Sequence, residues 1–260
     1  MGGRVGLLAA VLLLAGCGGV SEGQPEAIAE TGSVCETIAF EGTALTHCVA
    51  DPKRHTVFTV LADGEGKPYR SLAAYAAARP ADAPVVAFAM NGGMYDEAGQ
   101  PIGYFVEQGD RLHKLNRAEG PGNFHLKPNG VFFGTGSKWQ VLDSESFYAK
   151  ISKRPEFATQ SGPMLVIDGT LHSGFDADGE SRKLRNGVGV GADGRAHFVI
   201  SDQPVSFGKF ARFFRGELKT PNALFLDGSV SQLWDPARDR MDVGAVLGPL
   251  IIVENRATAP

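Results

Sequence analysis

The sequence lacks several features that assign a function directly. It has no basic excess, because 25 Lys and Arg residues stand against 29 Asp and Glu residues and give a net charge of −4. Affinity for nucleic acid needs clustered positive charge, so we expect no nucleic-acid partner. No serine stands in a Gly-x-Ser-x-Gly elbow, and Gly189-x-Gly191 falls short of a dinucleotide-binding fingerprint. A standard serine hydrolase and a dinucleotide enzyme are therefore not supported.

Patterns that bind metal ions are equally scarce. The chain has 3 cysteines, and His113, His125 and His172 are scattered, so no zinc set is formed. The Asp-Ala-Asp-Gly stretch at 176–179 matches only part of a calcium loop and is interpreted as a turn. We expect neither a metal ion nor another cofactor.

The N-terminal residues contain a short apolar run. Val5 to Leu14 follow Arg4, and this length is too short to cross a bilayer as a helix but suits the core of a signal peptide. The next residues complete the sequence Leu-Ala-Gly-Cys, which resembles the bacterial lipobox and implies that Cys17 becomes a lipidated N-terminus. A buried N-terminal helix with an incidental cysteine is the alternative.

These features define three segments. We expect a lipoprotein signal peptide at 1–16, a lipidated flexible tether at 17–33 that is rich in Gly, Ser, Glu and Gln, and a single folded domain at 34–256. The lipid anchor predicts a periplasm-facing protein of the bacterial cell envelope, and Gly18 after the cysteine favours the outer membrane.

The two remaining cysteines form an even pair in an exported chain. Export places Cys35 and Cys48 in an oxidising compartment, so we expect a disulfide between them. The bond would close a hairpin that turns near residues 41–43.

The folded part is predicted to be α/β (α+β), with a mixed β-sheet, crossover helices and antiparallel hairpins. Two segments each read as strand, helix and strand, and their helices are expected at 70–79 and 206–219. Such crossovers are expected to pair parallel strands and to bring the strand ends to one edge of the sheet, where ligands bind. The expected strands of these units are 55–63, 84–90, 196–201 and 222–226, and hairpins are expected at 103–115, 129–144 and 162–174.

Polar residues follow several of these strands. Any one such group is most simply a turn, but their repetition at strand ends favours a shared cleft. Two carboxylates over one cleft suit glycosyl transfer to water, and their separation would select retention or inversion. The residues concerned are Asn91, Gly92, Gln160, Ser161, Ser201, Asp202, Asp227, Gly228 and Ser229.

A basic cluster precedes the strand expected at 187–191. Arg182 and Lys183 are as well explained by solvation, whereas Arg185 stands beside Asn186 and the strand. The planar guanidinium of an arginine matches phosphate oxygens, so Arg185 is the better candidate for an anion contact.

Five ordered motifs together resemble the phosphodiester glycosidase family, that of N-acetylglucosamine-1-phosphodiester α-N-acetylglucosaminidase, over about residues 48 to 253. They read MNGGMY (90–95), TQSGPMLVIDG (159–169), RNGVGVGADG (185–194), ISDQPVSF (200–207) and NALFLDGSVS (222–231). The resemblance implies hydrolysis of a sugar-1-phosphodiester, with release of the sugar from a phosphate monoester. This chain has Asp-Gly-Ser-Val-Ser where the animal enzymes have Asp-Gly-Gly-Gly-Ser.

The resemblance also suggests roles for the candidate residues. Asp227 would be base or nucleophile, Asp202 a supporting acid–base or sugar-hydroxyl group, and Arg185 an electrostatic contact to phosphate. We expect hydrogen bonds to substrate from Asn91, Ser161 and Ser229, and the remaining substrate-binding candidates are Gly92, Gln160, Ser201 and Gly228. Two alternatives stay open, namely a non-catalytic envelope lipoprotein that binds a glycan or glycan phosphate, and a hydrolase of another envelope bond, as in peptidoglycan or a capsule polymer.

Overall fold

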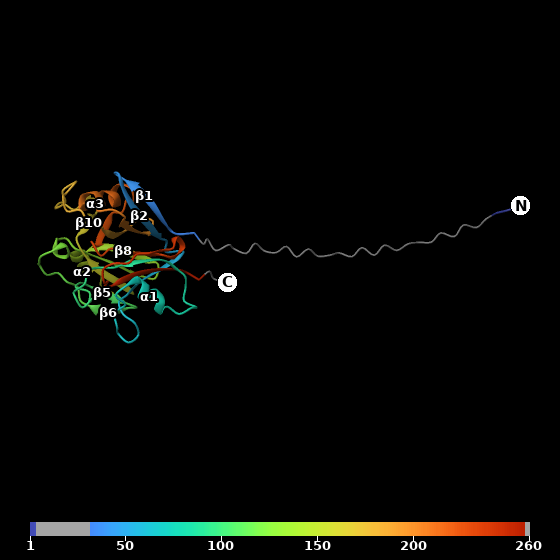
Figure 1. The fold of residues 1–260 in the computed structure, drawn as a ribbon, viewed down its shortest axis with the longest axis horizontal. Helices are drawn as coiled ribbons and strands as arrows, with labels where there is room; N and C mark the ends of the chain where they lie inside the picture. Colours follow the sequence, from blue (N-terminus) through green and yellow to red (C-terminus); the bar gives the residue numbers. More distant parts are fainter. Residues whose placement is uncertain (4–31, 258–260) are drawn as a thin grey trace. The chain divides into compact units, whose positions relative to one another are not determined.

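A computed structural model describes residues 1–3 and 32–257 (Figure 1). Residues 32–257 lie within one compact unit. Most of the predicted signal peptide, Cys17 and nearly all of the predicted tether lie outside the described residues, so these assignments remain predictions. Within the part that is described, no helix is long and apolar enough to span a membrane.

Over the described residues, seventeen strands form three sheets, which we name A, B and C. Sheet A has the order β1(Cys35–Phe40), β2(Thr43–Ala50), β13(Ala196–Ser201), β12(Asn186–Val190), β14(Asn222–Asp227), β10(Met164–Ile167), β11(Thr170–Leu171). Sheet B has the order β16(Arg240–Met241), β15(Leu233–Asp235), β4(Val86–Asn91), β17(Leu250–Asn255), β3(His55–Val60). Sheet C has the order β6(Asp110–His113), β5(Phe105–Glu107), β9(Phe157–Ser161), β7(Gly130–Thr135), β8(Lys138–Asp143).

Every strand pair described in these sheets is antiparallel, so the predicted parallel pairing within a mixed sheet is wrong. The two strand-helix-strand units do exist. Their strands run in the same direction, but in each unit a third strand is inserted between them. Strand β17 separates β3 from β4, and β12 separates β13 from β14. The inserted strand pairs antiparallel with both neighbours, so the fold is mostly β rather than a parallel α/β sheet.

Each sheet has one helix against it. Helix α1(Leu72–Ala78) packs on sheet B, α2(Ser144–Lys150) on sheet C and α3(Phe207–Gly216) on sheet A (Figure 1). Ser206 caps α3, since its hydroxyl accepts a hydrogen bond from Lys209 N at 3.2 Å. Two short 3₁₀ turns, η1(Asn123–His125) and η2(Pro236–Arg238), complete the described elements.

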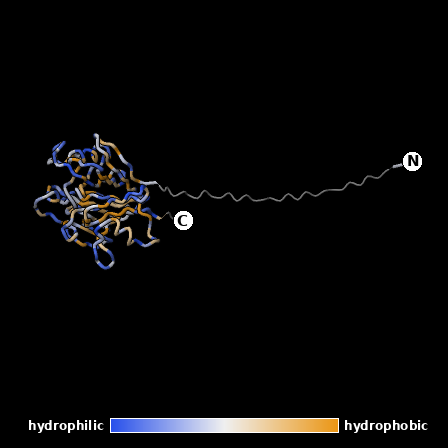
Figure 2. The backbone as a smooth tube through the Cα atoms, viewed as in Figure 1, coloured by the Kyte–Doolittle hydropathy of each residue, from blue (hydrophilic) through white to orange (hydrophobic). Residues whose placement is uncertain are grey.

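The three sheets meet at a common apolar core. Leu224 and Leu226 of β14 join it from sheet A, Phe88 from sheet B and Phe132 from sheet C. The alternate residue Phe225 faces α3 instead. Both faces of β14 are therefore buried, which explains its unbroken apolar run, and Figure 2 shows hydrophobic colour concentrated along the strands.

The predicted hairpins are confirmed. Strands β5 and β6, β7 and β8, and β10 and β11 pair within the ranges expected from the sequence. The disulfide is confirmed as well, since Cys35 and Cys48 are bonded across the β1–β2 hairpin with Cα atoms 3.9 Å apart.

Candidate active site

The ends of strands from all three sheets converge at one place. Asn91 is the last residue of β4 in sheet B, and Ser161 is the last residue of β9 in sheet C. Asp227 ends β14 of sheet A, where β12 begins with Asn186. The hydroxyl of Ser161 donates to the carbonyl of Leu226 at 2.6 Å and so ties β9 to β14. Strand convergence, rather than a parallel edge, thus brings together the predicted residues Asn91, Ser161 and Asp227.

A buried amide pair forms the centre of the site. The Asn186 amide nitrogen donates to the backbone oxygen and to Oδ1 of Asn91, both at 3.0 Å. Asn186 Oδ1 in turn accepts the backbone N–H of Asp227 at 2.9 Å. Asn186 thereby joins β4 to the end of β14. Its signal in the sequence was an Asn-Gly pair at a strand end, like Asn91-Gly92.

One donor of this amide pair is left over. Asn91 Oδ1 accepts from Asn186 and also from the backbone N–H of Gln232 at 2.9 Å. Asn91 is only 1 % exposed, and its buried amide nitrogen has no hydrogen-bond partner among the described residues. Buried polar groups are nearly always hydrogen-bonded, so an orphan donor here is a ready contact for a ligand oxygen.

The Asp227 carboxyl group lies in an environment that disfavours its charge. Burial raises its pKa to about 6, and the one counteracting contact among the described residues is the Gly228 N–H, which donates to Oδ1 at 2.7 Å. Tyr95 lies close enough for the charge of Asp227, together with burial, to raise the tyrosine pKa. A carboxyl group that titrates near neutral pH can either donate or accept a proton.

Asp202 lies in a contrasting environment. Its two oxygens accept from Thr46 Oγ1 at 2.8 Å and from Arg240 Nη1 at 3.0 Å, and Arg240 also pairs with Asp242 at 2.9 Å. No sequence pattern had pointed to Arg240. The paired carboxylate of Asp202 and the uncompensated carboxyl of Asp227 are thus suited to different roles.

A hollow of about 240 Å³ lies beside Asp202. Ser231 is shared, because it lines the hollow with Asp202 while its hydroxyl donates to the Gly228 carbonyl at 2.6 Å. The other residues of the wall are Leu184, Ile200, Ser201, Arg240, Asp242 and Val243.

Arg185 does not join this cluster. Its guanidinium donates to the carbonyls of Val205 and Ser181, both at 2.9 Å, and lies 3.6 Å from the centre of the Phe207 ring. Burial lowers its pKa to about 10, and no carboxylate among the residues described pairs with it. Since adjacent strand residues point to opposite faces, Asn186 faces the site and Arg185 faces α3.

Two of the other predicted residues, Gln160 and Ser201, use their polar groups in hydrogen bonds within the protein. Gln160 is 2 % exposed, and its Oε1 accepts from the backbone N–H groups of Tyr104 at 2.7 Å and Asn116 at 2.9 Å. Its Nε2 donates to the Asn116 carbonyl at 2.7 Å and to the Ser144 hydroxyl at 2.9 Å. The Ser201 hydroxyl accepts Arg185 N at 2.9 Å. The side chains of Gln160 and Ser201 therefore stabilise the backbone around the site. Ser229 is exposed and has no hydrogen bond in the described part of the chain.

The glycines of the site are not equivalent. A Cβ on Gly93 would lie 2.2 Å from the Gln160 carbonyl oxygen, so that position admits no side chain. A Cβ on Gly92 would meet Pro249 at 3.4 Å, and one on Gly228 would meet nothing nearer than the Phe225 ring at 3.8 Å. Gly228 also has no positive φ, so the fold does not require a glycine there.

Residues 85–241, which include Asn91, Asn186, Asp202 and Asp227, match the phosphodiester glycosidase family profile. The match covers more than half of the chain, and the protein therefore belongs to this family. It is 40% identical over 149 residues to the uncharacterized protein YigE of Escherichia coli K12, covering 57% of this chain and 58% of YigE. The chain thus spans little more than half the length of that relative.

Two solved structures share the fold. The zebrafish N-acetylglucosamine-1-phosphodiester alpha-N-acetylglucosaminidase catalytic domain, auto-inhibited by its pro-peptide, superposes with a TM-score of 0.58 at 12% identity, covering 85% of this chain and 82% of that one. A hypothetical protein from Synechocystis has a TM-score of 0.52 at 15% identity, covering 85% of this chain and 61% of that one. At these identities the likeness concerns the fold.

Proposed function

We propose that this protein is a hydrolase that cleaves the glycosidic bond of a sugar-1-phosphodiester. Water adds to the anomeric carbon, the bond from that carbon to the phosphate oxygen breaks, and a free sugar and a phosphate monoester leave. Membership of the phosphodiester glycosidase family supports this class of reaction. The observation that carries the proposal for this chain is the half-buried Asp227 carboxyl, with its raised pKa, near the orphan Asn91 amide.

The chemistry assigns a distinct task to each group. A phosphate leaves as a stable anion, so the reaction needs less help from an acid than from a base or nucleophile. Asp227 in its ionised form takes that task, and Asn91 donates a hydrogen bond to a substrate oxygen. Asp202, already paired with Arg240, orients a sugar hydroxyl.

We assign Arg185 a supporting part. Its guanidinium fastens the carbonyls of Ser181 and Val205 at the edge of β12, which fixes Asn186 as the next residue. A direct contact with phosphate, as the sequence suggested, would require the side chain to leave these carbonyls and the Phe207 ring.

The test is product analysis by mass spectrometry on a panel of sugar-1-phosphodiesters and cell-wall fragments. Asp227→Asn is expected to lower kcat/KM at least ~100-fold, the scale of a lost acid–base group. Asp168→Asn makes the same change at an exposed Asp-Gly turn and serves as the matched control. Saturable binding without product would instead favour a glycan-phosphate-binding protein, and cleavage of a wall fragment alone would point to another envelope bond.

The pH profile supplies a second readout. Because Asp227 must be ionised to act as base or nucleophile, kcat/KM should fall about tenfold per pH unit below 6 and level off above it. A profile that rises toward acid pH would assign Asp227 the role of general acid and overturn the assignment made above.

We further propose that the protein is lipidated at Cys17 and faces the periplasm from the outer membrane. The lipobox-like sequence supports this proposal. Wild-type protein should fractionate with membranes, and a Cys17→Ser variant should not. Equal fractionation of wild type and variant would refute the proposed lipid anchor.

A further inference from the structure

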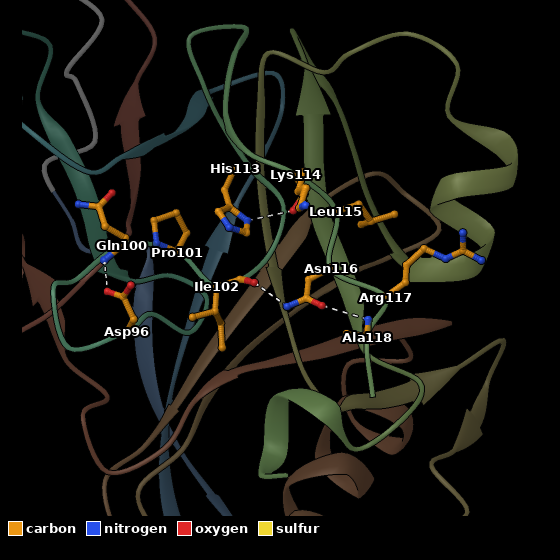
Figure 3. A pocket seen from close by; sticks show the side chains of 10 residues that line it. All are labelled: Asp96, Gln100, Pro101, Ile102, His113, Lys114, Leu115, Asn116, Arg117 and Ala118. Carbon is orange, nitrogen blue, oxygen red and sulfur yellow. Dashed lines mark hydrogen bonds between the residues drawn. The ribbon is translucent and has the colours of Figure 1, made fainter. Parts of the chain in front are cut away.

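A second cleft lies beside the candidate active site. Figure 3 shows its two walls, the hairpin that carries Asp96 to Ile102 and the segment from His113 to Ala118. Its volume is about 520 Å³, within the range of roughly 300 to 1,000 Å³ that is usual for ligand sites. The hollow beside Asp202, at about 240 Å³, falls below that range. A substrate larger than one sugar therefore needs room beyond that hollow.

One hairpin links the cleft to Asp227. Tyr95, whose pKa is raised by burial and by the charge of Asp227, forms a β-bridge with Pro101 in the wall of the cleft. Asn91 begins the same segment and Ile102 closes it, through a hydrogen bond from Ile102 N to the carbonyl of Met94 at 3.1 Å. The segment from Asn91 to Ile102 thus connects the wall of the cleft with the surroundings of Asp227.

The walls of the cleft are held in place. The Asn116 amide nitrogen donates to the Ile102 carbonyl at 2.8 Å, which joins one wall to the other. Gln160 fixes Asn116 from below through both backbone groups, at 2.9 Å and 2.7 Å. Behind the hairpin, the Arg70 guanidinium occupies the space where a side chain on Gly99 would lie, and Gly99 has a φ of +82°. A site held in this way needs little reorganisation when it binds a ligand.

The charge of the cleft favours an anion. Two cations, Lys114 and Arg117, and the half-exposed His113 face a single carboxylate, Asp96. Arg117 is occupied, since both its Nε and Nη2 donate to Glu145. Asp96 Oδ1 already accepts the Gln100 N–H at 2.9 Å. Lys114 is exposed and has no ionic partner among the described residues, so it remains available to a ligand.

We infer that this cleft holds the aglycone of the substrate, and that the aglycone is anionic, carrying a phosphate of its own beyond the scissile one. The inference rests on the proposed function. Lys114 pairs with the second phosphate, while Pro101, Ile102 and Leu115 contact its carbon chain. The protein then acts on the end of a phosphate-bearing chain rather than on a sugar phosphate with a small neutral alcohol.

Two substrates with the same sugar test this inference, one with a methyl aglycone and one with a phosphoglycerol aglycone. Lys114→Glu should raise KM for the phosphoglycerol substrate about five- to tenfold, as expected for reversal of one exposed charge, and leave the methyl substrate unchanged. Lys114→Arg should restore binding. Lys138→Glu reverses an exposed lysine at the far end of β8 and serves as the matched control. Equal effects on both substrates, or an equal effect of Lys138→Glu, would overturn the inference.

A binding measurement separates this inference from the reaction itself. In the Asp227→Asn protein, calorimetry should detect glycerol 1-phosphate binding that glycerol does not reproduce and that Lys114→Glu weakens. Cleavage of neither substrate would refute the proposed function while leaving this measurement to decide the cleft. Glycerol phosphate that binds no better than glycerol, or equally well after Lys114→Glu, would refute the anionic cleft.

Discussion

Replacement of Asp227 by asparagine should make the protein more stable while it removes activity. The pKa of Asp227 is about 6, against 3.8 for an ordinary aspartate, and each pKa unit is worth about 1.4 kcal/mol. Keeping the charged form in place therefore costs up to about 3 kcal/mol at neutral pH. Because the residue retains partial contact with solvent, we expect a gain of about 1 to 2 kcal/mol in the free energy of unfolding.

The gain should depend on pH in one direction. Between pH 3.8 and 6 the folded state holds the Asp227 proton more tightly than the unfolded chain does, so wild-type stability falls relative to the variant as the pH rises. Below this window the carboxyl group is neutral in both states, and the difference shrinks. Above pH 6 it stays constant. Asparagine keeps an oxygen for the Gly228 N–H, so no hydrogen bond is lost.

Urea denaturation of wild type, Asp227→Asn and the Asp168→Asn control at intervals from pH 4 to pH 8 measures the effect. The variant curve should rise above the wild-type curve with increasing pH, and the control should follow the wild type. A variant that is less stable than wild type at pH 8, or a difference that does not change with pH, would refute the view that Asp227 is a destabilising functional group.

Two further predictions follow from the packing. Gly93→Ala should destabilise the fold by about 2 kcal/mol or more, because its Cβ would meet the Gln160 carbonyl. Gly228→Ala, in contrast, should keep wild-type stability and weaken substrate binding. Equal melting temperatures for the two variants would contradict this prediction. Burial lowers the pKa of both His47 and His197 from 6.5 to about 4, so unfolding by urea should become easier as the pH falls from about 6.5 to 4, and His197→Gln should reduce that slope. A slope unchanged by His197→Gln would exclude the pair as its source.

Local structure was largely predictable from the sequence. The cap at Ser206, the apolar face of α3 and the Gly-containing hairpins depend on neighbouring residues, and short-range patterns identify them. The buried strand at 222–226 was identified by its apolar run, and the structure extends it to Asp227.

Strand order was not predictable in the same way. Nothing near β3 or β4 shows that β17 lies between them, and nothing near β13 or β14 shows that β12 does. A crossover helix is compatible with adjacent parallel strands and equally with a gap filled by a strand from elsewhere in the chain. Such pairing is a long-range property that periodicity does not encode.

The site shows the same division. Polar residues at strand ends marked Asn91 and Asp227, but the direction of a side chain depends on its partners. Arg185 and Asn186 were one motif in the sequence, but Arg185, which directly precedes β12, contacts Phe207, whereas Asn186 contacts Asn91. Arg240 carried no signal, because its value lies in contacts with Asp202 and Thr46 from distant strands.

Because β17 lies between β3 and β4, the candidate active site can form only late in the synthesis of the chain. Asn91 is paired with Leu250, and the N–H of Gly92 donates to the carbonyl of Pro249 at 2.7 Å. During synthesis, β4 emerges long before these partners, so its end has no fixed position while most of the protein is being made. The protein should therefore be inactive until residues 249–255 are in place, and a nascent or truncated chain that stops before them would carry every candidate catalytic residue without a working site.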